Sequence, residues 1–263
     1  MRIDVLTLFP ELVAEVARYG VPRIATANGA LELRARQIRD YSTDRNRRVD
    51  ERPYGGGPGM VMQAEPLSQA VAAAKQEMEA AGIAGAKVAL LSPQGEKLTQ
   101  PWLRRLAQEP GLILVCGRYE GVDERFAAQM DLELSLGDYV LSGGELAAMV
   151  VVDGIARLLP GVLGDAESAE QDSFSAGTGG LPGLFDHPHY SRPEHWRGEA
   201  VPEILLGGDH ARVARWRLKQ ALGRTWLRRP ELLDGLELDD LQTRLLREYI
   251  AEAARDAGEE RQA

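Results

Sequence analysis

The sequence predicts an α/β fold with a parallel sheet, followed by a smaller helical C-terminal domain. Over the first 160 residues, short apolar runs alternate with helix-like stretches, which is typical of βαβ units and a mainly parallel sheet. The segment 164–183 is rich in glycine and small polar residues, as linkers are. We therefore expect an α/β domain at 1–164, a flexible linker at 165–185 and a helical domain at 186–263.

The expected strands follow from their residue patterns. AKVALLS and LILVCG are largely apolar, which favours strands buried on both faces of a sheet. LELRARQI shows only partial alternation of apolar and polar residues, as a less buried strand would. In chain order, the strands are RIDVLTLF at 2–9, LELRARQI at 31–38, AKVALLS at 86–92 and LILVCG at 112–117.

Helices are expected where proline and glycine bracket a helical pattern. One begins at Pro66 and ends before Gly82, because proline suits the first turn of a helix and glycine its end. From Asp209 onward, leucines recur at helical spacing, as at Leu218 and Leu222. The second domain is therefore expected to be mainly helical.

Composition places the chain among globular proteins. Apolar residues make up 44% and charged residues 27% of the sequence, and no apolar run approaches the ~20 residues that span a bilayer. Asp4 and Pro10 interrupt the first apolar stretch, so we expect no signal peptide. Cys116 is the only cysteine, which excludes an internal disulfide and agrees with a reducing compartment. We expect a cytoplasmic protein that does not enter a membrane.

Charge is segregated along the chain. The net charge of −9 argues by itself against a nucleic-acid partner. However, the run Arg212–Arg229 carries seven lysines and arginines and no acid, with Trp216 and Trp226 between them. A second patch of arginines lies at 44–52. Such local concentrations of positive charge on an acidic chain indicate anion binding, as in RNA recognition.

Three expected strands end in glycine-bearing loops. PQGEK follows 86–92, RYEG follows 112–117, and LELSLGDYVLSGGE at 132–145 passes through paired glycines. Ligands of open α/β sheets bind beyond the carboxyl ends of the strands, and glycine lets the backbone approach them closely. The three loops are therefore expected to wall one pocket. The loop RPYGGGPGM at 52–60 matches no phosphate-binding motif and is equally consistent with a purely structural turn.

Few residues offer catalytic chemistry. Cys116 has no histidine nearby in sequence and is expected to be a buried structural thiol. His187, His189 and His195 match no zinc spacing, so we expect no metal site, and the pattern gives His187 and His189 no role. Carboxylates and arginines remain. Arg157 stands just before the linker, Asp172 lies within it and Asp186 directly follows it.

Motifs along nearly the whole chain resemble those of the bacterial tRNA (guanine-N1)-methyltransferases, a family of the SPOUT class. Each motif alone is weak, but so many in one order are specific. They are LFPE at 8–11, RPYGGGPGM at 52–60, LSPQG at 91–95, LVCGRYEG.DER at 114–125, GDYVLSGGE at 137–145, PGVLG at 160–164, DSF at 172–174 and RWRLKQ.LGRTWLRRPELL at 215–233.

The resemblance implies a deep trefoil knot, a homodimer and S-adenosylmethionine bound by the three loops. It implies methylation of N1 of the tRNA guanosine immediately 3′ of the anticodon (position 37), with a guanosine preceding it. Asp172 would be the general base and Arg157 would hold the base at O6. The implied cofactor-binding residues are Leu91, Ser92, Pro93, Gly117, Tyr119, Glu120, Leu136, Gly137, Asp138, Tyr139, Val140, Leu141, Gly143 and Gly144. An assisting Mg²⁺ is compatible with this chemistry, but no residues are assigned to it.

The sequence departs from the family pattern at three places. Leu90 stands where the family often has tyrosine, Ala147 replaces a common proline, and the linker after Phe174 is longer. Two further interpretations stay open on the residues alone. One is a non-enzymatic RNA-binding protein that uses the basic run, and the other is an α/β enzyme acting on a small nucleotide.

Overall fold

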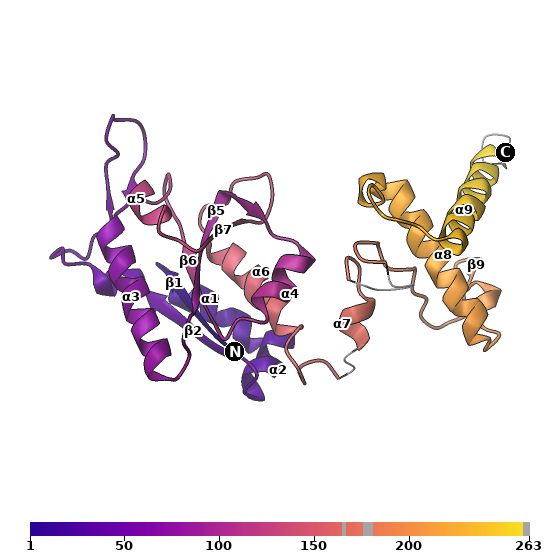
Figure 1. Cartoon of the computed structure of the whole chain (residues 1–263), viewed down its shortest axis with the longest axis horizontal. Helices are drawn as coiled ribbons and strands as arrows, with labels where there is room; N and C mark the ends of the chain where they lie inside the picture. The colour runs from indigo at the N-terminus through magenta and orange to yellow at the C-terminus, as the bar shows by residue number, and fades with distance from the viewer. Residues whose placement is uncertain (165–166, 176–180, 260–263) are drawn as a thin grey trace. The chain divides into compact units, whose positions relative to one another are not determined.

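The structure of the protein is a computed structural model that describes residues 1–164, 167–175 and 181–259. The chain forms two compact units, Met1–Gly164 and Asp165–Ala263 (Figure 1). The first contains a five-stranded parallel sheet in the order β2-β1-β6-β5-β7, as predicted. The strands are β1 Arg2–Thr7, β2 Glu32–Gln37, β5 Lys87–Lys97, β6 Gly111–Cys116 and β7 Leu132–Ser135.

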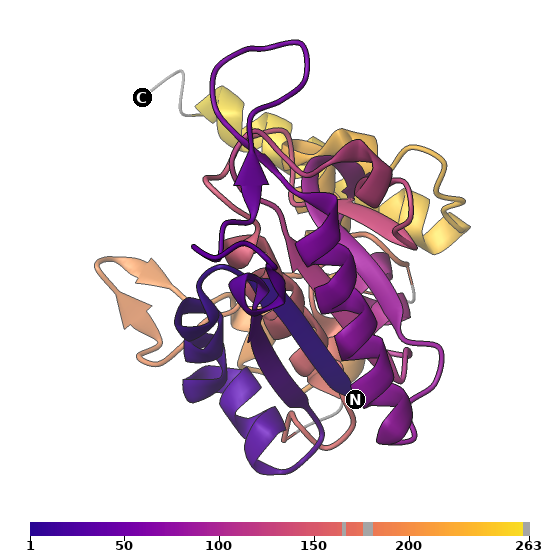
Figure 2. The same cartoon turned by 90° about the vertical axis from the view of Figure 1, so that its left-hand side faces the viewer.

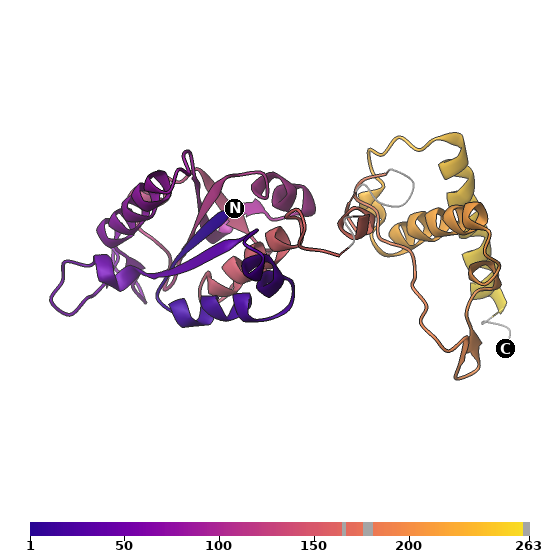
Figure 3. The same cartoon turned by 90° about the horizontal axis from the view of Figure 1, so that it is seen from below.

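Helices cover both faces of this sheet. On one face α1, α2, α4 and α6 enclose a core that includes Leu112 and Leu114 of β6. On the other face, α3 and α5 enclose a core that includes Ile113 and Val115 of the same strand. The long helix α3 lies on the opposite side of the sheet from α1 and α2 (Figure 2 and Figure 3). The helices are α1 Pro10–Ala14, α2 Gly20–Ala27, α3 Ala64–Ala80, α4 Gln100–Leu106, α5 Glu124–Ala127 and α6 Glu145–Ala156, with 3-10 turns Glu15–Arg18 and Ile38–Tyr41.

The apolar runs explain which strands are central. Every residue of β6 is buried because the strand lies between two neighbours and under two helix layers. Strand β2 is at the edge of the sheet and is largely half-buried, which agrees with its partial alternation. Strand β5 is longer than expected. It continues through a bulge between Leu91 and Glu96 and pairs again with β7 beyond it.

An ionic network joins β1, β2 and α3. Asp4 is fully buried and accepts hydrogen bonds from Arg2 at 2.7 Å and from Arg36. Glu77 of α3 forms salt bridges with Arg36 at 2.6 Å and with Arg34 at 3.1 Å. The hydrogen bond from Arg36 is the main cause that lowers the pKa of Glu77 to about 2. The network therefore fastens the edge strand to the helix above it.

The second unit is mainly helical, as predicted. Helices α8 (His210–Arg228) and α9 (Asp240–Glu259) pack around Leu218, Leu222 and Leu245. A Cβ on Gly223 would collide with the ring of Tyr249, so this glycine permits the close approach of the two helices. The other elements are α7 Glu167–Gln171, the hairpin β8 His195–Trp196 with β9 Glu199–Ala200, and 3-10 turns Glu203–Leu205 and Pro230–Leu232.

The segment predicted as a flexible linker contains structure. Helix α7 lies within it, and Ser175 is buried with its hydroxyl donating to the carbonyl of Ala169 at 2.9 Å. Residues 165–166 and 176–180 of this segment lie outside the described residues. No helix of the described chain is both long and apolar enough to cross a bilayer.

Candidate functional site: three loops at one edge of the sheet

The three glycine-bearing loops lie at the same edge of the sheet. Strands β6, β5 and β7 are neighbours and parallel, so their carboxyl ends point in one direction. The loops are 92–95 at the bulge of β5, 117–121 after β6 and 136–144 after β7. This edge is where open α/β sheets bind ligands.

The loops after β6 and β7 contact each other through their backbones. The N–H of Gly144 donates to the carbonyl of Gly117 at 2.9 Å, and Arg118 bridges with Gly143. A Cβ at position 144 would lie 2.8 Å from Cα of Cys116, closer than a side-chain carbon can approach. Only glycine therefore lets this loop pass directly over the end of β6.

The bulge of β5 completes the arrangement. A Cβ on Gly95 would collide with the backbone of Glu133 and Leu134, so this glycine allows β5 to touch β7. On the other side, the carbonyl oxygen of Leu91 lies 3.6 Å from the position of a Cβ on Gly117. The bulge of β5 is thus packed against β7, and the residue before it lies beside the loop after β6.

The residues implied as cofactor-binding lie on these loops, except Leu91, which stands just before the bulge of β5, and they form two groups. Glycines make up most of the buried or half-buried group, and the exposed group carries apolar and aromatic side chains together with two carboxylates. Backbone hydrogen-bonding groups beside apolar side chains suit a ligand with polar edges and apolar faces. The first group is Leu91, Ser92, Gly117, Leu136, Gly137, Gly143 and Gly144, and the second is Pro93, Tyr119, Glu120, Asp138, Tyr139, Val140 and Leu141.

The loop 52–60, which the sequence left open as purely structural, supports the RYEG turn. The backbone N–H of Glu120 donates to the carbonyl of Met60 at 2.9 Å. Tyr119, just before it, has a φ of 61°, an unfavourable conformation that such support helps to maintain. A Cβ on Gly59 would collide with the Glu120 side chain. In the sequence, the glycines of this loop were the only indication of such a close contact.

A buried carboxylate, Glu145, was missed by the sequence reasoning. It is 1% exposed at the start of α6 and accepts hydrogen bonds from Thr7 at 2.8 Å and from Arg118 at 3.1 Å. The Arg118 guanidinium also stacks 4.3 Å from the ring centre of Phe9. Glu145 therefore links β1, the RYEG turn and α6. Its position directly after the paired glycines of SGGE indicated a residue close to the loops. Its partners could not be inferred, because they lie far away in sequence.

Cys116 is a buried thiol, as expected. It is fully buried beneath Gly144, and burial raises the pKa of its thiol well above 9. The carboxylate of Glu145 raises this pKa further, against the effect of Arg118. Because the thiolate is the nucleophilic form, Cys116 is unsuited to catalysis.

The two implied catalytic residues lie in different units. Arg157 follows the last turn of α6, with its N–H donating to the carbonyl of Asp153 at 3.3 Å. Asp172 is half-buried in the turn after α7, where its carbonyl accepts from the N–H of Ser175 at 3.1 Å. The N–H of Phe174 donates to the carbonyl of Leu184 at 2.7 Å, which fixes this turn within the second unit.

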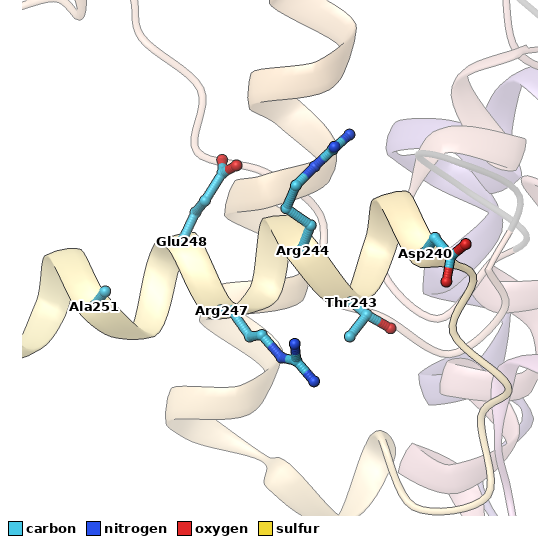
Figure 4. A pocket seen from close by; sticks show the side chains of 6 residues that line it. All are labelled: Asp240, Thr243, Arg244, Arg247, Glu248 and Ala251. Carbon is cyan, nitrogen blue, oxygen red and sulfur yellow. The ribbon is translucent and has the colours of Figure 1, made fainter.

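The basic helix α8 uses two of its cations within the fold. Arg215 pairs with Glu248 of α9 at 3.1 Å, and Lys219 pairs with Glu252 at 2.8 Å. Other cations of α8 have no ion pair within the described part of the chain, namely Arg212, Arg217, Arg224 and Arg228. Helix α9 adds a shallow depression that Arg244 and Arg247 line (Figure 4).

In the patch at 44–52, an ion pair within the patch neutralises part of the positive charge. Arg48 donates to Asp44 at 3.0 Å, which limits its availability to an anion. Arg47 pairs in the same way with Asp40, just outside the patch. The cations without ion pairs in the described chain are therefore more concentrated on α8.

Two of the four histidines meet at one carboxylate. Asp186 lies 2.6 Å from Nδ1 of His187 and 2.7 Å from Nε2 of His189, whereas His195 lies apart on β8. Burial lowers the pKa of His187 and outweighs the opposing effect of Asp186. Burial acts to raise the pKa of Asp186, but the hydrogen bonds from His189 and from the N–H of His187 together lower it.

Comparison with known proteins shows the family to which the chain belongs. The family model described as tRNA (Guanine-1)-methyltransferase TrmD matches residues 1–235. The chain is 56% identical to the "tRNA (guanine-N(1)-)-methyltransferase" of Chromobacterium violaceum over 253 residues, covering 96% of this chain and 97% of the relative. It is 56% identical to that of Methylococcus capsulatus with the same coverage, and 57% identical to that of Nitrosospira multiformis over 88% of each chain. The chain therefore belongs to the tRNA (guanine-1)-methyltransferase TrmD family, whose fold is of the SPOUT class.

Proposed function

We propose that the protein transfers a methyl group from S-adenosylmethionine to N1 of the guanosine immediately 3′ of the anticodon, position 37 of tRNA. Membership of the family and the names of the relatives support tRNA guanine-N1 methylation. One observation carries the assignment to a site. Three glycine-bearing loops lie at the carboxyl edge of β6, β5 and β7, and Gly144 of one loop lies against Gly117 of another. The protein would act in the cytoplasm.

The loops have the chemistry that S-adenosylmethionine requires. Glycine-bearing backbone in the loops at 117–121 and 136–144 offers N–H and carbonyl groups to the edge of an adenine ring. Tyr119 is 44% exposed and Tyr139 56% exposed, so aromatic faces are available beside that backbone. A trefoil knot requires the chain to be threaded through one of its loops, and we include such a knot in the proposal because the family is of the SPOUT class.

The chain's own residues would supply the proton chemistry. When bound, S-adenosylmethionine supplies a methyl group made electrophilic by its sulfonium. Guanine N1 is a poor nucleophile until it loses its proton, and a carboxylate oxygen of Asp172 accepts that proton. Such a base accelerates a reaction ~10²–10⁴-fold. The guanidinium of Arg157 donates hydrogen bonds to O6, where negative charge develops as the proton leaves. No described residue is assigned to a Mg²⁺ ion in this step.

A homodimer would complete the site. Apolar side chains are exposed on neighbouring helices of the first unit, with Leu12 of α1 40% exposed, and Leu146 and Val150 of α6 52% and 47% exposed. Leu146 and Val150 are four residues apart and therefore share one face of α6. Exposed apolar side chains gathered in this way favour a protein partner, here a second copy of the chain.

The decisive experiment measures methyl transfer to tRNA transcripts with and without a guanosine before the target. We expect transfer only to the transcript that carries this guanosine. The Asp172→Asn variant should bind S-adenosylmethionine and tRNA almost normally but lose ~10²-fold or more in turnover. Near-normal turnover would remove Asp172 from the general-base role, and Asp186 would then be the next carboxylate to test.

Mixing variants tests the shared site. If Asp172 of one protomer serves the cofactor site of the other, Asp172→Asn mixed with an Arg157→Ala variant should regain partial activity after subunit exchange. A mixture that stays inactive although mixed dimers form would place both residues in one protomer's site. Calorimetry with S-adenosylmethionine separates the enzyme from a non-enzymatic RNA-binding protein, because only the enzyme binds the methyl donor.

A further inference from the structure

The second unit contains a compact cluster of side chains of the kinds that bind metal ions. Asp186, His187 and His189 each offer one ligand atom, and these atoms lie within 4.8 Å of one another. The two imidazole rings are 4.4 Å apart between their centres. Two nitrogens and a carboxylate oxygen form one of the donor sets that zinc prefers in proteins.

One ligand atom lacks the hydrogen bond that its burial demands. His187 is only 6% exposed, and its Nδ1 atom is buried without a hydrogen-bond partner. The Oδ1 atom of Asp186 lies 2.6 Å away, but the geometry of the contact is not that of a hydrogen bond. A buried ring nitrogen without a hydrogen bond costs free energy, and in a native structure it requires an explanation. An ion at this point would supply the missing partner.

The cluster opens onto a cavity of about 330 Å³. The cavity gives access to the ligand atoms from outside, and the His189 side chain at its mouth is 71% exposed. The remaining lining comes from the turn after α7, from the segment before the cluster and from α8, namely Ser173, Phe185, Arg224 and Arg228. Three protein ligands with an accessible fourth position resemble open zinc sites rather than closed ones.

The backbone that carries the ligands is held in place. The N–H of Asp186 donates to Oγ of Ser173 at 2.9 Å. The N–H of Phe185 donates to Oγ1 of Thr225 on α8 at 2.9 Å. Both bonds fix the segment before the first ligand, and so reduce the ordering that an ion would have to impose. Pre-organisation of this kind favours binding.

We propose that Asp186, His187 and His189 bind one divalent transition-metal ion, with Zn²⁺ as the best match. Imidazole nitrogen selects ions such as Zn²⁺ and Co²⁺, whereas Mg²⁺ and Ca²⁺ require mostly oxygen ligands. The guanidinium groups of Arg224 and Arg228 oppose added positive charge, and this further disfavours ions held by charge alone. The proposal is independent of the methyl-transfer chemistry.

The test uses Co²⁺ as a spectroscopic probe on the full-length, chelator-treated protein. We expect one equivalent of Co²⁺ to produce the intense visible absorption of a four-coordinate site, and one equivalent of Zn²⁺ to abolish it. The His189→Ala change removes an exposed side chain and should leave the fold intact. It should weaken Co²⁺ binding by more than ~10-fold, the lower end of what loss of even an outer-shell partner costs. Asp186→Asn and His187→Ala should weaken it similarly.

The controls are the other two histidines, outside the cluster. His195→Ala in the hairpin and His210→Ala at the start of α8 should bind Co²⁺ like the unmodified chain, and circular dichroism should show every variant folded. Equal affinity in the His189→Ala and unmodified proteins would overturn the proposal, as would absence of stoichiometric binding. Stabilisation by inorganic phosphate but not by Zn²⁺ would also overturn it, and would assign the cavity to an anion held by Arg224 and Arg228.

Discussion

At the residue scale, Gly144 shows how backbone contact can define a binding site. Its missing side chain allows the loop after β7 to lie on Cys116 and to bond with Gly117. The same residue is the N-cap of α6, and the first residue of that helix is the buried Glu145. A change at Gly144 would therefore displace two loops and the ion pair between Glu145 and Arg118 together.

We predict that Gly144→Ala weakens S-adenosylmethionine binding by more than ~10-fold and lowers stability by about 1–3 kcal/mol, the cost of overpacking a tight contact. The physical reason is the 2.8 Å approach of the new Cβ to Cα of Cys116. Calorimetry and urea unfolding measure the two effects. Gly164→Ala is the matched control, because a Cβ there meets nothing within 4 Å. Normal affinity in the Gly144 variant would separate this contact from the cofactor site.

At the element scale, charged side chains fasten secondary structures in both units. Glu77 of α3 holds arginines of the edge strand β2, and Glu248 and Glu252 of α9 hold cations of α8. Ion pairs at the surface contribute little each, so their role is best tested by their dependence on pH and salt.

The Glu77→Gln variant should show a pH-dependent loss of stability. The pKa of Glu77 is lowered from 4.5 to about 2 in the folded protein, so its stabilisation is present above pH 4.5 and is lost as the pH falls toward 2. Because the side chain is 49% exposed, we expect a loss of about 1 kcal/mol at pH 7. Urea unfolding from pH 7 to pH 3 should show the difference shrinking. The Glu79→Gln variant on the same helix is the control and should show no pH-dependent loss of stability. A difference that stays constant with pH would contradict the assignment.

Binding of tRNA should depend on the cations of α8 that no described acid neutralises. Each phosphate contact contributes ~0.7–0.9 to the slope of log affinity against log salt. We expect Arg212→Gln and Arg217→Gln each to flatten this slope, and Arg215→Gln to change it less, because Arg215 already pairs with Glu248. Fluorescence titration at several salt concentrations measures the slopes. Unchanged slopes in all three variants would move the footprint to the patch at 44–52.

Residue patterns predicted the sheet and the loops because these depend on local signals. The apolar run of β6 and the glycines after β5, β6 and β7 are visible in short windows. The partners of Glu145 are not, since Thr7 lies 138 positions away. The spacing of His187, His189 and His195 matched no zinc pattern, so no metal site was expected, and the grouping of Asp186 with His187 and His189 was missed. Side-chain direction in an irregular segment, which spacing does not reveal, brings them together.

At the scale of the whole molecule, each unit has its own core. The cores on the two faces of the sheet use residues from the first unit only, whereas Leu184, Leu218 and Leu245 belong to the core of the second. The loops at the sheet edge and Arg157 lie in the first unit, and Asp172 and the basic helix lie in the second. The proposed cofactor binding and proton transfer are thus divided between the units.

A fragment consisting of residues 1–164 should therefore fold and bind S-adenosylmethionine without methylating tRNA. Its cores are complete, but it lacks the carboxylate of Asp172 and the cations of α8. Circular dichroism, calorimetry and a methyl-transfer assay test the three parts of this expectation. The full-length Asp172→Asn variant is the control, since it should bind tRNA and the fragment should not. A folded fragment with no affinity for S-adenosylmethionine would place part of the cofactor site in the second unit.

The burial of Cys116 has a practical consequence for spectroscopy. Because the only natural thiol lies under Gly144 and has a strongly raised pKa, maleimide dyes should leave the unmodified chain unlabelled. A cysteine introduced at Val140, which is 84% exposed, would then be a unique attachment point on the loop after β7. A fluorophore there would report in real time how this loop responds when methyl donor and tRNA arrive, without prior removal of any native residue.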